Sequence, residues 1–271
     1  MLFKLLKYEI KASGRTLIPL YIGILALSVV IGLAFSGLVN QVQYNGFLFS
    51  AFEEAGTLSG LLMLLLFALY IALGVLTILS IIQRFNNNLL GDEGFLMFTL
   101  PVKSTTLLLS KLLAAMCWVV LAGFIGFLSM SIIVAMILIF TPEFNFFNEL
   151  AYLWEAVIEN ITFEKISLML KSLVLSLLDL CGVILTAYWA MMIGQLQKFA
   201  NHRIIVSFVA FFVINWLYSV ITNPILGPFS YNITSYEVFG SYLWVHIIIS
   251  AIEAIATFFI VNFMTQKYLN L

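Results

Sequence analysis

The feature that most constrains this chain is a series of long apolar runs that contain few charged residues. A helix needs about 20 consecutive apolar residues to cross the hydrocarbon core of a bilayer, whereas a transmembrane barrel would show short segments of alternating polarity. Runs of the helical kind occupy residues 16–38, 58–82, 107–140, 168–196, 204–222 and 242–265. Only 9% of the residues are charged, against about 25% in soluble domains. The pattern predicts an all-α membrane protein with six transmembrane helices.

The distribution of basic residues predicts the orientation of these helices. Of the 12 Lys and Arg residues, all but Lys165 and Lys171 lie in segments that would share one side of the membrane. These segments precede the first run, follow the sixth, or connect the second run to the third and the fourth to the fifth, with the adjoining run ends included. Short cytoplasmic segments carry an excess of Lys and Arg, so we expect both termini in the cytoplasm. We treat residues 1–271 as a single transmembrane domain. The net charge of −1 gives no reason to expect nucleic acid as a partner.

The first turns of the chain combine basic and apolar residues. Lys4, Lys7, Lys11 and Arg15 are spaced by one helical turn each and share a face. A basic amphipathic helix binds the anionic inner leaflet, so we expect an elbow helix that lies on membrane lipid and turns into the bilayer near Pro19. The alternative is that these residues only set the topology.

The connection at residues 83–103 is unusually apolar for a cytoplasmic loop. Large apolar side chains there need a membrane, a neighbouring helix or a partner protein to cover them. Asp92 and Glu93 favour the start of a short helix, and Pro101 ends it. We predict a helix that docks a soluble partner, whereas the alternative is an interfacial helix that packs on lipid. The candidate docking residues are Asp92, Glu93, Gly94, Phe95, Leu96, Phe98, Leu100 and Pro101.

Two outer connections and several tryptophans carry weaker signals. Residues 148–161 show an apolar stripe at helical spacing, which predicts an amphipathic helix on the outer surface. Residues 223–241 contain Pro and Gly breakers, which favour a turn or a re-entrant segment. Four tryptophans lie near run ends, where we expect them to anchor the helices at the interface: Trp118, Trp154, Trp216 and Trp244.

Two acidic residues, Asp179 and Glu253, lie inside the predicted spans. A charged group at the centre of a bilayer costs roughly 2.5–3.5 kcal/mol on insertion scales, so such groups usually face a cavity or a partner. His246 precedes Glu253 by two helical turns on the same face. We consider all three as candidates for a substrate path or gate. The alternative is that the acids are protonated, or are structural groups bonded to Ser, Thr or Tyr on other helices.

Two segments carry a family resemblance. They are LLKYEIK at 5–11 with RTLIPLY at 15–21, and GDEGFLMFTLPV at 91–102 with LLLSKLL at 107–113. In these segments and in its six-span layout the chain resembles the permeases of type-2 ATP-binding-cassette exporters of Gram-positive bacteria. The resemblance implies a multi-pass permease of a bacterial plasma membrane, with the elbow helix and a coupling helix between spans two and three. It also implies cytoplasmic ATPase subunits and a second copy or a related permease as partners.

The expected function is therefore export of a substrate, such as a peptide, a drug or a lipid-like molecule, driven by a separate ATPase. The chain has no Gly-x-x-x-x-Gly-Lys-Ser/Thr phosphate loop. We therefore expect ATP and Mg²⁺ to bind the partner ATPase, and we expect no cofactor or metal on this chain. A membrane-embedded enzyme is one alternative, but no His-Glu-x-x-His motif is present and His202 and His246 lie far apart in sequence. A membrane scaffold or sensor that does not transport is the other alternative.

Overall fold

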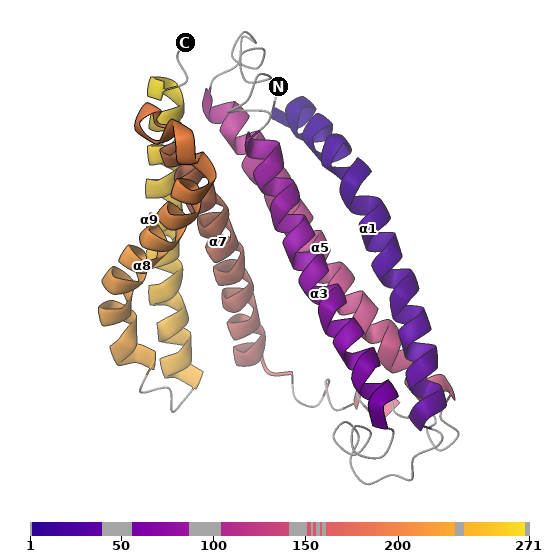
Figure 1. The fold of residues 1–271 in the computed structure, drawn as a ribbon. Helices are drawn as coiled ribbons and strands as arrows, with labels where there is room; N and C mark the ends of the chain where they lie inside the picture. The colour runs from indigo at the N-terminus through magenta and orange to yellow at the C-terminus, as the bar shows by residue number, and fades with distance from the viewer. Residues whose placement is uncertain are drawn as a thin grey trace. The chain divides into compact units, whose positions relative to one another are not determined.

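The computed structural model describes residues 2–39, 56–86, 104–140, 161–230 and 236–268, together with five residues between 151 and 158. Within these ranges the regular structure is helical (Figure 1). The main helices are α1 (Leu2–Val39), α3 (Gly56–Phe85), α5 (Ser104–Phe140), α7 (Phe163–Gly194), α8 (Arg203–Ser230) and α9 (Tyr236–Tyr268). A short 3-10 helix, η2 (Gln197–His202), joins α7 to α8. Among the described residues, six helices are long and apolar enough to cross a membrane, which confirms the predicted all-α class and agrees with the six predicted spans.

The chain forms two compact units. The first unit contains Met1–Ile10, Ile81–Met116 and Ile161–Leu271, and the second contains Lys11–Ser80 and Cys117–Asn160. Helices α1, α3 and α5 each contribute to both units. The prediction of a single domain stays a prediction.

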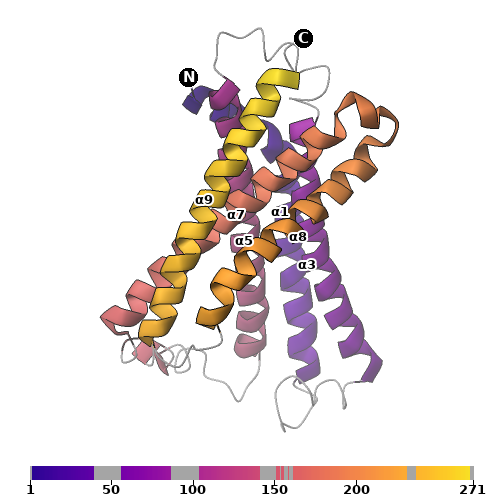
Figure 2. The same cartoon turned by 90° about the vertical axis from the view of Figure 1, so that its left-hand side faces the viewer.

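The first unit is built on α7, which packs against α8 and α9 (Figure 2). Its core also takes in the end of α3 and the beginning of α5, so the residues that flank the predicted docking segment are part of it. The most deeply buried members of this core are Phe85, Leu108, Leu185, Tyr188 and Val261. The beginning of α1 and the end of α9 lie at the same end of this unit in both views.

A glycine makes the close return from α7 into α8 possible. A Cβ atom on Gly194 would lie 2.1 Å from Ser207 Oγ and 2.6 Å from the carbonyl oxygen of Arg203. The second of these atoms belongs to the backbone and cannot swing away, so only a residue without a side chain fits at this corner.

The second unit has its own apolar core between α1, α3 and α5. Ile31 and Phe35 of α1 pack with Ile133 and Ile137 of α5, and three leucines of α3 cover them. The Tyr70 hydroxyl is hydrogen-bonded to Ser129 Oγ at 2.9 Å, which joins α3 to α5. Each of these helices buries an apolar stripe in the unit, as is usual for helix packing.

Trp118 is part of this second unit and is not an interfacial anchor. It is 4% exposed, its ring lies 6.0 Å from that of Tyr21, and the Tyr21 hydroxyl donates to its carbonyl oxygen at 3.2 Å. The prediction made for Trp118 from its position near a run end is therefore wrong, because a tertiary contact covers it. Trp154, Trp216 and Trp244 are exposed, as interfacial side chains would be.

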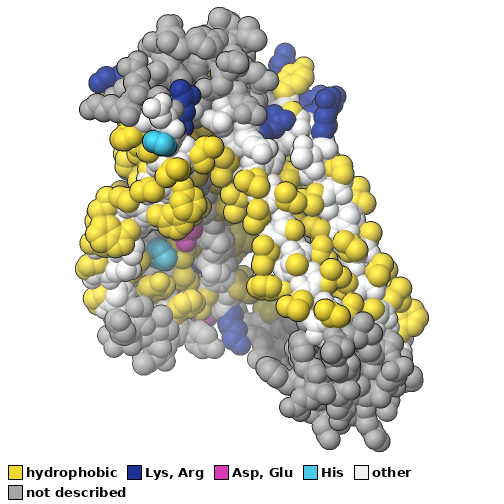
Figure 3. Space-filling model, in the orientation of Figure 1, with side chains coloured by type: hydrophobic (Ala, Val, Ile, Leu, Met, Phe, Trp, Pro, Cys, Tyr) yellow, Lys and Arg dark blue, Asp and Glu magenta, His cyan; other side chains and the backbone are white. Residues whose placement is uncertain are grey.

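Large hydrophobic side chains cover the outside of the helices (Figure 3). Helix α8 is the extreme case, since none of its most apolar window is buried. Phe208, Phe212 and Trp216 of this helix are each more than half exposed. Hydrocarbon, rather than water, is the environment in which such a surface is stable.

The predictions for residues 223–241 and for residues 148–161 have different outcomes. Helix α8 continues through Pro224 and Pro228 to Ser230, so the predicted end of this span at residue 222 is wrong. Proline is tolerated in apolar helices when neighbouring groups satisfy the freed carbonyls. Of the helix predicted at 148–161, the residues that the structure describes between 151 and 158 are helical and exposed.

Candidate functional site

The predicted docking segment lies between two well-placed helix ends. Its candidate residues, from Asp92 to Pro101, are outside the residues that the structure describes. Helix α3 ends at Phe85, on the N-terminal side of these residues, and α5 begins at Ser104, on their C-terminal side. Both helix ends belong to the first unit, so their contacts show what the segment is attached to.

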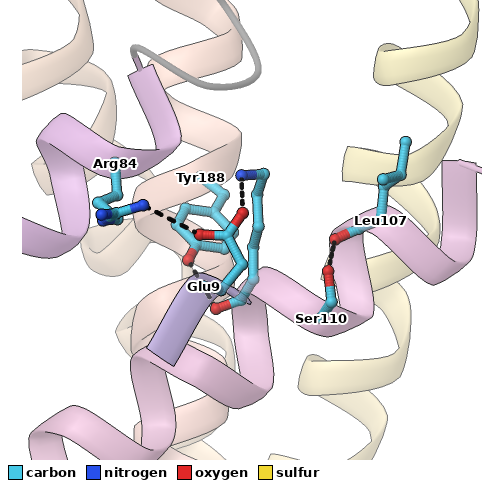
Figure 4. A network of polar contacts seen from close by, with 6 residues as sticks. Glu9, Arg84, Leu107, Ser110 and Tyr188 are labelled. Carbon is cyan, nitrogen blue, oxygen red and sulfur yellow. Dashed lines mark hydrogen bonds and ion pairs between the residues drawn. The ribbon is translucent and has the colours of Figure 1, made fainter. Parts of the chain in front are cut away.

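A buried carboxylate joins these two helix ends. Glu9 Oε1 of α1 accepts a hydrogen bond from Lys111 Nζ of α5 at 2.7 Å, and Glu9 Oε2 lies 3.4 Å from Arg84 Nη1 of α3. Figure 4 shows the Glu9 and Arg84 side chains pointing toward each other. The side chains of Lys111 and Glu9 are only 5% and 9% exposed, whereas that of Arg84 is 29% exposed. One carboxylate therefore serves two cations from two other helices.

The end of α7 is part of the same arrangement. The Tyr188 ring stacks on that of Phe85, with 3.9 Å between ring centroids and 11° between planes. Its hydroxyl donates to the carbonyl oxygen of Lys111 at 3.5 Å, a long bond. Both rings are almost completely buried. We call these five residues, Glu9, Arg84, Phe85, Lys111 and Tyr188, the junction.

The junction brings together the ends of four helices within the first unit. It contains the first turns of α1 and α5 and the last turns of α3 and α7. Helices that cross a membrane alternately bring the same kinds of ends to one side, so this arrangement agrees with successive crossings. Leu108, Leu112 and Ile184 belong to the same buried apolar core as Phe85 and Tyr188. In such surroundings, removing one partner of an ion pair leaves an uncompensated charge and costs about 3–5 kcal/mol.

A second group of polar residues lies between α7, α8 and α9. Ser250 Oγ of α9 donates to Asp179 Oδ1 of α7 at 2.6 Å. The Tyr218 hydroxyl of α8 donates to the Ile249 carbonyl oxygen of α9 at 3.4 Å and lies near the Glu253 carboxylate. That carboxylate also lies over Gly182 of α7, where a Cβ atom would be 3.5 Å away. We call Asp179, Tyr218, Ser250 and Glu253 the polar cluster. The structure thus brings together both acids that the sequence singled out, and Asp179 is hydrogen-bonded to a serine on another helix.

His246 lies on the same face of α9 as Ser250 and Glu253. Its ring is 5.7 Å from that of Tyr242. Its Nδ1 atom is buried and has no hydrogen-bond partner among the described residues. The role of Asp179, Glu253 and His246 in a substrate path or gate stays a prediction.

The basic residues at the start of α1 are all exposed: Lys4, Lys7, Lys11 and Arg15. Glu9 and Ser13, which lie between them in sequence, are buried. Helix α1 runs through Pro19 without a break. The elbow helix on lipid stays a prediction, and the exposed basic face is compatible with it.

Sequence reasoning missed the junction. In the sequence, Lys111 and Arg84 served only to predict the orientation of the helices, and Glu9 was not singled out. The available signal was a lone acid in the basic first turns, about 200° around the helix from Lys7 and therefore off the basic face. Which residues it pairs with depends on contacts between segments far apart in sequence, so no local pattern shows them.

In comparisons with known proteins, no family model, no curated protein and no solved structure matches the chain. Within the described residues, no three His, Cys, Asp or Glu side chains come together as a metal-binding group.

Proposed function

We propose that this chain is the permease subunit of an ATP-driven exporter of the ATP-binding-cassette class, in a bacterial plasma membrane. The apolar segment at residues 92–101 would dock a cytoplasmic ATPase subunit that binds ATP and Mg²⁺. A second copy or a related permease would complete the transporter. The exported substrate would be a peptide, a drug or a lipid-like molecule.

The observation that supports this proposal is the junction. A protein that pulls on the segment between α3 and α5 pulls on Arg84, Phe85 and the first turns of α5. Those residues are held by Glu9 of α1 and Tyr188 of α7. Displacement of a short cytoplasmic segment would therefore reach four apolar helices at once. A packed core passes displacement on because it has little free volume, and an ATP-driven transporter needs such a connection.

Co-purification tests the proposal first. The chain, expressed with its native genetic neighbours and extracted in mild detergent, should bring down a protein with a phosphate-loop motif. Reconstituted vesicles should then hydrolyse ATP and move one probe from a panel of fluorescent peptides, drugs and labelled lipids. A membrane enzyme or a scaffold would show no such companion, and that result would refute the proposal.

Substitution tests the docking segment directly. Replacing Glu93, Phe95 and Leu96 by Ala should leave the protein inserted but separate ATP hydrolysis from transport. Phe163, Glu164 and Ile166 at the start of α7 provide a matched control, because they are exposed side chains of the same kinds. The docking assignment would be contradicted if transport per ATP were unchanged in the docking-segment variant. It would also be contradicted if the docking-segment variant and the α7 control lost transport per ATP equally.

A further inference from the structure

The two ion pairs of Glu9 differ in length and in the burial of the cation, and both properties affect how easily an ion pair opens. The pair with Lys111 is short, at 2.7 Å, and both side chains are at least nine-tenths buried. The pair with Arg84 is long, at 3.4 Å, involves one guanidinium nitrogen, and leaves Arg84 29% exposed. Water can solvate Arg84 when it leaves, but it cannot solvate Lys111 without opening the core.

The neighbours of Arg84 show where movement would begin. Phe85 is 1% exposed and stacked on Tyr188, so it holds α3 in the core. Asn86, the next residue, is exposed and accepts a hydrogen bond from Gln195 Nε2 at the end of α7, at 3.3 Å. The chain around Phe85 is therefore held by one buried contact and by two weaker contacts within reach of water.

We propose that Glu9–Arg84 is a releasable latch on the last turn of α3, with Lys111 as the fixed partner of Glu9 and Phe85 as the pivot of α3. In the closed state Arg84 and Asn86 hold the end of α3 to Glu9 and Gln195. When the latch opens, Arg84 moves into water and Asn86 becomes free, while Phe85 keeps α3 in the core. Glu9 remains bonded to Lys111 throughout. Glu9 and Arg84 are thus positioning residues, and the assignment of the segment as an ATPase-docking element rests on the proposed function.

The physical basis is the different cost of opening the two pairs. An exposed ion pair contributes little, because water replaces the partner and the side chains regain rotational freedom. A buried pair is costly to separate, because the remaining charge stays in apolar surroundings. The junction therefore has one contact that opens at low cost beside one that does not, which is the condition for a local two-state element.

Spin-label distances test the latch in the purified chain, without an ATPase. With Cys117→Ala and Cys181→Ala as background, one label replaces Phe3, which is 82% exposed, and the other replaces either Asn86 or Gln83. Arg84→Gln should broaden the 3–86 distance distribution and add a longer component, while the 3–83 distribution stays narrow. The label at Asn86 removes the Gln195 bond, so the Arg84 contact is measured alone. Unchanged 3–86 distances, or equal broadening of both pairs, would overturn the proposal.

Thermal unfolding in detergent tests the asymmetry. Arg84→Gln should lower the midpoint by less than about 2 °C, whereas Lys111→Met should lower it by roughly 10 °C. If Lys111→Met does not fold, Lys111→Arg should fold with a narrow 3–86 distribution. Equal destabilisation by Arg84→Gln and Lys111→Met would show that the Arg84 contact is as fixed as the other, and would overturn the latch.

Coupling in the reconstituted complex tests what the latch does. Arg84→Gln should raise substrate-free ATP hydrolysis about twofold to fivefold, the population shift expected from loss of an exposed ion pair, and should lower transport per ATP. Arg84→Lys should restore both values, and Arg203→Gln, an exposed arginine at the start of α8, should change neither. Normal coupling in Arg84→Gln, in a complex that transports, would overturn the proposal. If the wild-type chain brings down no ATPase, the proposed function fails, and the distance and unfolding measurements still decide the latch.

Discussion

The junction and the polar cluster differ in the partners that they provide for acidic side chains. At the junction Glu9 is buried and faces two cations. In the polar cluster, Asp179 and Glu253 have hydroxyl partners, and among the described residues no ion pair is formed by either of them. The first site therefore depends on charge for its stability. The second has only hydrogen bonds to lose, and its acids are open to another role.

The largest expected effect is the loss of the carboxylate at the junction. Glu9→Ala should lower the free energy of unfolding by about 3–5 kcal/mol, because it leaves Lys111 buried and unpaired. Reversible unfolding in mixed detergent micelles measures this value. Glu164→Ala, an exposed acid at the start of α7, is the matched control and should change little. A loss below about 1 kcal/mol for Glu9→Ala would remove the contrast between the two sites.

A smaller effect is expected from the loss of a hydroxyl in the polar cluster. Ser250→Ala removes the hydroxyl that donates to Asp179 Oδ1 at 2.6 Å. It should destabilise the protein by about 1–2 kcal/mol, because a partly buried acceptor loses its partner. The same unfolding experiment applies, with Ser172→Ala as control, since that exposed serine bonds only to its own helix. An effect as large as that of Glu9→Ala would show that charge is also essential here.

Neutralising an acid of the polar cluster should change stability little. Glu253→Gln keeps the shape of the side chain and a carbonyl oxygen for the Tyr218 hydroxyl, so we expect a change within about 1 kcal/mol. Assembly should be normal and transport altered, measured in reconstituted vesicles beside Glu164→Gln. Wild-type transport would exclude Glu253 from the substrate path or gate.

The smallest effect should come from the hydroxyl of Tyr188. Its bond to the Lys111 carbonyl oxygen is 3.5 Å long, so Tyr188→Phe should cost less than about 1 kcal/mol and leave the stack on Phe85 in place. Tyr188→Leu, which removes the stack, is the comparison and should cost clearly more. Equal losses in the two variants would mean that the hydroxyl, rather than the ring, holds α7 at the junction.

Much of the helical framework could be read from the sequence. All six predicted spans correspond to helices, because the length of an apolar run is a local property that hydrocarbon thickness selects. The end of α8 could not be placed, since Pro224 and Pro228 read as breakers although the helix continues to Ser230. Trp118 was misplaced for a related reason: its position near a run end suggested the interface, but Tyr21 packs against it.

The candidate sites divide in the same way. Asp179 and Glu253 could be found from the sequence because an acid in an apolar run is conspicuous, and even the kind of partner could be predicted. Their actual partners, Ser250 and Tyr218, needed the packing of α7, α8 and α9. The residues of the docking segment, from Asp92 to Pro101, remain a prediction from sequence, because they lie outside the described part of the chain.

The sequence by itself determined the six apolar helices that the described residues form, since backbone groups in hydrocarbon must be satisfied within each helix and composition decides where that is possible. The tertiary structure decided which charges meet. Glu9 shares its carboxylate with Lys111 and Arg84 from helices far along the chain, and the burial of each pair, rather than the identity of its residues, sets which one can open. Burial is a property of the packed helices, because the dielectric around a charge comes from all of its neighbours together.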